Sequence, residues 1–214
     1  MTKKITISVL LLIFTITISY SQSRDKKLGL RYSSDYALFQ GEGKFVYNPT
    51  VGHKLGLIKE NGSLTLGGEL GYFNFSPKEE EFYYLTSNTT YGTAKYSDYK
   101  ILSLNLIFLW NLQVNRNFQI KPGVHSGYYF VMYETSISDD FVNSTESFIS
   151  GRGGITPTIE FHYALNENWS IDAHSMYHIF FEIGNSDPSS VNFNSSLGIA
   201  HRVWSNGLGI TYFF

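Results

Sequence analysis

The sequence predicts an all-β fold: a transmembrane, eight-stranded, antiparallel, up-and-down β-barrel. Three observations indicate it. Aromatic residues make up 17% of the 214 residues, yet beyond residue 21 no apolar run is long enough for a spanning helix. Eight segments alternate between apolar and polar residues, as strands of membrane barrels do. The last of them, Gly207 to Phe214, alternates up to the final residue, and a closed barrel leaves no free strand edge there.

The first residues resemble a secretory signal. Lys3 and Lys4 precede an uncharged apolar run over residues 5–18, and small residues at Ser19 and Ser21 suit a cleavage site. We expect a signal peptide over residues 1–21 and one barrel domain over residues 22–214. An amino-terminal anchor is less favoured, because the run is shorter than the ~20 residues of a spanning helix.

Composition excludes several classes of function. The chain has no cysteine, which removes disulfides, thiol nucleophiles and the lipid-bearing cysteine of a lipoprotein. Its net charge of −2 gives no indication of nucleic-acid binding.

We expect the strands near residues 27–37, 45–58, 63–75, 99–114, 118–133, 149–165, 169–183 and 204–214. Short turns separate the second and third, fourth and fifth, and sixth and seventh strands, at residues 59–62, 115–117 and 166–168; the Asn-Gly pair in the first is a strong hairpin signal. The other connections are longer, including 76–97 and 134–147. Alternating short periplasmic turns and long extracellular loops are typical of outer-membrane barrels.

Each expected strand has one apolar face. In chain order these faces carry Leu28, Leu30, Tyr32 and Tyr36; Phe45, Tyr47, Val51, Leu55 and Leu57; Leu64, Leu66, Leu70 and Tyr72; Leu102, Leu104, Leu106, Phe108, Trp110 and Leu112; Ile120, Val124, Tyr128, Phe130 and Met132; Ile155, Ile159, Phe161 and Tyr163; Ile171, Ala173, Tyr177, Ile179 and Phe181; Leu208, Ile210, Tyr212 and Phe214. Trp110, Phe118 and Trp169 lie beside short turns, where a periplasmic aromatic girdle is expected.

The opposite faces carry the charges. We expect a polar network in the lumen, formed by Arg31, Lys54, Glu69, Lys121, His125, Arg152, Glu160, His162, Asp172, His174, His178 and Glu182. If Leu165 lies opposite Trp169, then Glu160 faces His174, His162 faces Asp172 and Arg152 faces Glu182, at the ~5 Å of cross-strand neighbours.

A soluble lipocalin-like barrel, with its apolar face inward, is the rival fold. It is disfavoured because the polar faces are rich in Gly and short of Lys, and because aromatic residues gather at strand ends. Three residues fit the membrane barrel poorly. His53 falls on the apolar face, and Pro122 and Pro157 interrupt strands, where local bulges are expected.

The chain resembles the small bacterial outer-membrane β-barrel family of the OmpA transmembrane-domain and OmpX type. Its carboxy-terminal signature matches at Gly209, Tyr212 and Phe214, whereas Gly207 stands where a polar residue is usual. The resemblance implies a Gram-negative outer-membrane location and insertion by the outer-membrane assembly machinery, which reads that strand.

We expect a monomer surrounded by outer-membrane lipid, with a plugged lumen and a structural or surface-interaction role. Residues 76–97 could present an extracellular ligand-binding surface or be a solvated loop. The alternatives are a lipid-modifying enzyme and a narrow gated channel past Arg31, Lys54 and Lys121.

No cofactor, metal or catalytic residue is expected. An enzyme would pair His174 with Glu160 and a nearby serine. However, Ser126 and Ser175 alternate away from His125 and His174, so neither pair shares a face. His174 and His178, considered together with His162 as metal ligands, are four residues apart on a strand, roughly 13 Å.

Overall fold

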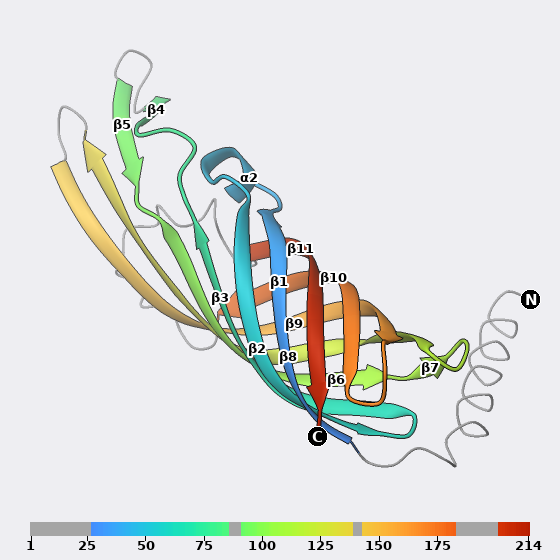
Figure 1. Ribbon diagram of the computed structural model, residues 1–214. Helices are drawn as coiled ribbons and strands as arrows, with labels where there is room; N and C mark the ends of the chain where they lie inside the picture. The colour runs from blue at the N-terminus through green and yellow to red at the C-terminus, as the bar shows by residue number, and fades with distance from the viewer. Residues whose placement is uncertain (1–26, 86–90, 139–142, 183–200) are drawn as a thin grey trace, which may run out of the picture.

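The computed structural model describes residues 27–85, 91–138, 143–182 and 201–214. Within them, eight long strands form a closed antiparallel barrel (Figure 1), so the predicted fold class is confirmed. The strands are β1 (Lys27–Phe39), β2 (Thr50–Asn61), β3 (Leu64–Phe75), β6 (Tyr99–Trp110), β8 (Phe118–Ser138), β9 (Asn143–Ala164), β10 (Trp169–Glu182) and β11 (His201–Phe213). The predicted signal peptide lies outside the described residues. The described part contains no helix of a length and apolarity that would span a bilayer.

The barrel closes where the last strand meets the first. β11 pairs with β1 on one side and with β10 on the other, and Tyr212 lies opposite both Leu30 and Trp169. β8 pairs with β6 and with β9, so every long strand has two neighbours. Closure satisfies the backbone groups that an open edge would leave unpaired.

Short turns close one end, which we call the turn end. In the first, Asn61 pairs with Leu64 and Gly62 has a φ of +58°, a conformation that glycine adopts without steric cost. In the others, Asn115 Oδ1 accepts from the backbone N–H groups of Asn117 and Phe118, and Asn166 Oδ1 does so from Asn168 and Trp169. These Asx turns explain the Asn-X-Asn sequences.

Strands extend further at the opposite end, the loop end. The predicted loop 134–147 is largely strand, because β8 continues to Ser138 and β9 starts at Asn143. The predicted loop 76–97 holds β4 (Phe82–Leu85) and β5 (Tyr91–Tyr96); β5 pairs with β8. Figure 1 shows these strands projecting beyond the barrel as an extension sheet.

Both predicted boundaries of the second strand were wrong. The predicted strand 45–58 starts only at Thr50, after the short helix α2 (Gly43–Val46), so Tyr47 is buried rather than on the outer face. The predicted turn 59–62 begins too early, because β2 runs to Asn61 and turns Glu60 inward.

The prolines interrupt pairing without the expected bulges. Met176 pairs with Thr158 and Ile179 with Ile155 in one register, and the ladder is missing only at Pro157 and its neighbour. Pro122 lies where β6 gives way to the two-residue strand β7 (Leu112–Gln113). A proline has no N–H to donate, so it breaks hydrogen bonds while the strand continues.

The interior is layered. At the loop end it holds a buried, mainly aromatic cluster, the loop-end cluster: Ala37, Phe39, Tyr47, Phe73, Phe75, Tyr99, Ile101, Tyr129, Val131, Tyr133, Phe180 and Val203. At the turn end a smaller cluster consists of Ile58, Ile107, Leu109 and Phe213. Buried polar and charged side chains occupy the space between them.

Candidate functional site

Ion pairs cross the middle of the lumen. Arg31 Nη1 lies 2.8 Å from Glu160 Oε1, and both side chains are 1–2% exposed. Lys54 Nζ lies 2.7 Å from Asp35 Oδ2. The first pair joins strands that are not neighbours in the sheet, and the second joins β1 to β2. Each of these buried charges therefore has a partner, and Arg31 ties two separate parts of the wall together.

Lys121 forms a third ion pair, with Glu60, nearer the turn end. Met176 Sδ accepts a second contact from the Lys54 ammonium, at 2.9 Å. With these contacts Arg31, Lys54 and Lys121 are each held by acceptors from other strands.

Four histidines extend the network. His162 Nδ1 lies 2.6 Å from Asp172 Oδ1, and His174 Nε2 lies 3.0 Å from Asp35 Oδ1. The hydroxyl of Thr156 lies 3.1 Å from His178 Nδ1.

His125 is held more loosely. Its nitrogens lie 3.5 Å from Glu69 Oε1 and 3.8 Å from Glu160 Oε1. Neither nitrogen forms a hydrogen bond within the described part of the chain. Buried polar atoms of this kind are commonly satisfied by internal water.

Eleven of the twelve residues proposed for the lumen have described side chains, and all eleven are buried. The side chain of the twelfth, Glu182, lies outside the described residues, although its backbone pairs with Arg152. The assumed register was correct, since His162 lies opposite Asp172 and His174 opposite Glu160.

Glu160 and His174 lie opposite each other in the backbone ladder, but their side chains do not bind each other. Glu160 binds Arg31 of β1, and His174 turns to Asp35. Asp35 and Glu60 were missing from the predicted network. Asp35 could have been found, because it follows Arg31 by four residues on the same face of the strand. Glu60 was hidden by the misplaced turn.

The outer surface carries an apolar belt. One member from each long strand is 39–55% exposed: Leu30, Leu55, Leu70, Leu104, Phe130, Ile159, Ile171 and Ile210. His53 also faces outward, where it hydrogen-bonds Tyr32 Oη at 2.8 Å. The belt therefore presents mainly hydrocarbon, and the outward-facing His53 side chain is locally paired with Tyr32.

Aromatic residues flank the belt. Trp110 and Trp169 are 50% and 41% exposed near the turn end. Phe118 stacks on Phe161, with ring centroids 6.4 Å apart. Towards the loop end, Trp204 is 45% exposed and donates its indole N–H to Ser175 Oγ. In membrane barrels, aromatic girdles form at strand ends of this kind.

The serines considered for catalysis face away from the histidines. Ser126 is exposed and Ser175 binds Trp204, while His125 and His174 are buried inside. Among the described residues no cluster of three metal-ligating side chains occurs.

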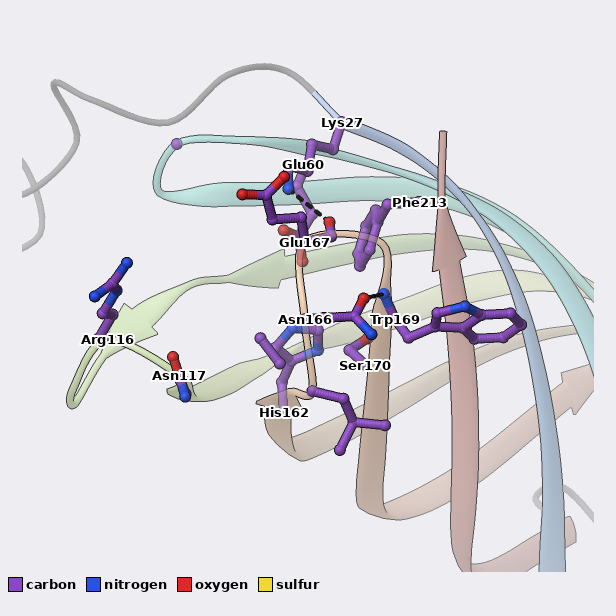
Figure 2. A pocket seen from close by; sticks show the side chains of 13 residues that line it. Lys27, Glu60, Arg116, Asn117, His162, Asn166, Glu167, Trp169, Ser170 and Phe213 are labelled. Carbon is purple, nitrogen blue, oxygen red and sulfur yellow. Dashed lines mark hydrogen bonds between the residues drawn. The ribbon is translucent and has the colours of Figure 1, made fainter.

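The turn end holds a pocket of about 450 Å³ (Figure 2), which we call the turn-end pocket. It opens between the short turns and reaches the end of the lumen network. Its lining includes Lys27, Glu60, Arg116, Asn117, His162, Asn166, Glu167, Ser170 and Phe213.

A second hollow of about 400 Å³ lies at the loop end, where the extension sheet leaves the barrel. Lys100, Glu134 and Ile149 are among its lining residues.

The loop after α2 is held to the segment that follows β3, because the Asn48 backbone N–H donates to the Ser76 carbonyl. Burial raises the pKa of the Tyr47 phenol above its usual value, so the loop-end cluster stays uncharged at this ring.

A closed eight-stranded barrel with an apolar outer belt and a charged interior defines a small transmembrane β-barrel. The chain belongs to the family described as Domain of unknown function (DUF2715), whose model matches residues 6–203. No curated protein matches the sequence.

Solved structures share the fold. A major outer membrane protein of Thermus thermophilus aligns with a TM-score of 0.54 at 14% identity, over 89% of this chain and 100% of that one. Neisserial surface protein A (NspA) aligns with a TM-score of 0.51 at 11% identity, over the same shares of the two chains. At these identities the likeness establishes the fold alone.

Proposed function

We propose that the protein is a monomeric, integral outer-membrane β-barrel with a plugged lumen and a surface-interaction role. The observation that carries the proposal is the belt, because every long strand contributes exposed hydrocarbon to it. In water such a surface would drive association. In a bilayer it is solvated by lipid, and a charge there would cost about 2–4 kcal/mol at mid-depth.

The layered interior supports a plug. An eight-stranded barrel has an interior that side chains can just fill. The Arg31–Glu160 and Lys54–Asp35 pairs occupy the middle, and apolar clusters lie at both ends. A conducting path would require breaking buried ion pairs, so a narrow gated channel is the weaker proposal.

The extension sheet supports the surface role. If the short turns face the periplasm, β4, β5 and the far ends of β8 and β9 stand outside the cell. Tyr83 and Ile149 are 73% and 80% exposed there, and exposed apolar surface supports contacts with another protein where it is contiguous. The proposed ligand surface is therefore wider than the predicted loop 76–97, because it includes the β8–β9 hairpin.

Insertion would use the last strand as its signal. Gly209, Tyr212 and Phe214 lie in or directly after β11, the strand that closes the barrel against β1. We infer that outer-membrane assembly machinery reads this strand before closure, with outer-membrane lipid as the final surroundings.

The test is gel migration of the protein extracted from membranes. A barrel that resists dodecyl sulfate without heating migrates differently before and after boiling. We expect such a shift, recovery in the outer-membrane fraction, and no regular conductance steps in planar bilayers. Recovery in the soluble periplasm without a mobility shift would overturn the proposal. Altered lipid A masses on expression would favour the lipid-modifying alternative, and regular conductance steps the channel.

A further inference from the structure

The turn-end pocket is separate from the ion pairs that fill the middle of the lumen, and it has a defined floor and rim. The floor consists of its buried lining residues, among them Glu60, His162, Ser170 and Phe213. The rim consists of lining residues that remain accessible, among them Lys27, Arg116 and Glu167. Its volume of about 450 Å³ is within the range of small-ligand sites.

An unsatisfied hydroxyl lies in the floor. Ser170 is 1% exposed, and its Oγ has no hydrogen-bond partner within the described residues. Buried side-chain polar atoms nearly always have a partner. Because Ser170 lines the pocket (Figure 2), the missing partner would come from whatever occupies it.

His162 adds a second polar side chain to the same floor. Its Nδ1 lies 2.6 Å from Asp172 Oδ1, and Asp172 Oδ2 accepts the Thr211 hydroxyl at 3.2 Å. A carboxylate can only accept, so the proton in this bond is on Nδ1, and Nε2 is the ring nitrogen that this bond leaves unused. The Glu60 carboxylate, whose Oε1 is paired with Lys121, adds acceptor oxygens to the floor. The floor is therefore suited to a ligand group that donates hydrogen bonds.

The rim carries both signs of charge. Lys27 and Arg116 are cationic and Glu167 is anionic. The Lys27 ammonium donates to the Glu167 backbone carbonyl at 2.8 Å, which leaves the Glu167 carboxylate uninvolved in that bond. A ligand that spans floor and rim therefore meets acceptors in the floor and cations at the edge.

We propose that the turn-end pocket binds the zwitterionic end of a short peptide, with its free ammonium on Ser170, His162 and Glu60 and its carboxylate at the cationic rim. Given the orientation in the proposed function, on which this inference rests, the pocket faces the periplasm. Peptidoglycan stem peptides carry this chemistry in their diamino acid, where a free ammonium and a carboxylate share one carbon.

The experiment is a titration of isotope-labelled protein, refolded in detergent, with the tripeptide L-Ala-γ-D-Glu-meso-diaminopimelate, followed by amide NMR shifts. We expect saturable shifts in residues 164–170. Acetylation of the free diaminopimelate ammonium, with the L-Ala amine left free, or Ser170→Ala should weaken binding about tenfold or more, the effect of losing one well-placed polar contact.

Glu79→Gln, a charge removal at the loop end, is the matched control and should leave the affinity unchanged. The pocket proposal is overturned by the absence of saturable shifts, or by equal affinity for the acetylated peptide or for the Ser170→Ala variant. Heat-modifiable migration of each sample separates this outcome from failure of the barrel. A protein that keeps its mobility shift but ignores the peptide contradicts only the pocket.

Discussion

Glu160→Gln removes one charge from the centre of the lumen at nearly constant shape. Both carboxylate oxygens accept from Arg31 Nη1, at 2.8 and 3.1 Å, and the two side chains are almost fully buried. Glutamine would leave the guanidinium without its counter-ion, and breaking a buried ion pair in this way costs about 3–5 kcal/mol. Glu69 and Asp172 also interact electrostatically with Arg31, so we expect the lower value, about 3 kcal/mol.

The assay is urea unfolding in lipid vesicles, followed by tryptophan fluorescence. With a denaturant dependence of about 1–3 kcal/mol per molar urea, the midpoint should fall by about 1–3 M. Glu79→Gln, an exposed change of the same kind, should shift the free energy of unfolding by less than about 0.5 kcal/mol. Replacing Arg31 and Glu160 together by methionine should recover most of the loss, because neither member of the pair is left as a buried charge without its counter-ion. The reasoning fails if Glu160→Gln unfolds at the wild-type midpoint, or if the double variant is as unstable as the single one.

Three further changes test other parts of the molecule. Leu104→Arg, in the middle of the belt, should cost about 2–4 kcal/mol in bilayers, and Leu165→Arg at the turn end about 0–1 kcal/mol; equal urea midpoints would argue against a lipid-facing belt. Gly127→Ala should lower the unfolding midpoint, because a Cβ there would meet the Leu104 carbonyl and Asn105; a midpoint unchanged from wild type would contradict this close approach. Deleting Phe214 should lower the amount of heat-modifiable barrel in outer membranes of expressing cells, while the deleted protein still refolds in detergent; undiminished assembly in cells would refute the signalling role.

The barrel could be predicted from the sequence because period-two alternation marks each strand and its faces directly. Leu208, Ile210 and Phe214 were assigned outward, and they are exposed. The cross-strand pairs of β9 and β10 also followed, because the turn after Leu165 is short and a short turn determines the register.

The extension sheet could not be predicted in the same way. Residues 134–138 and 143–147 are mostly polar on both faces, so alternation gives no signal although backbone pairing continues. Tyr47 was assigned to the wrong face because an aromatic residue fits the sequence pattern equally well in a buried cluster and on a lipid-facing surface.

The interior was predicted only in part for a related reason. Alternation tells which face a charge lies on, whereas partners across the lumen depend on barrel closure. Arg31 reaches Glu160, 129 positions further along the chain, and no spacing in the sequence encodes that contact. The turn-end pocket was missed altogether, because it forms between three turns that are distant in sequence.

The central claim is that the belt faces lipid, and the protein's own fluorescence can test it. All three tryptophans, Trp110, Trp169 and Trp204, lie on the outer face and are 41–50% exposed. In vesicles of lipids brominated near the headgroup, their emission should be strongly quenched, while aqueous iodide should have little effect. Efficient quenching by iodide, with no response to brominated lipid, would contradict the account.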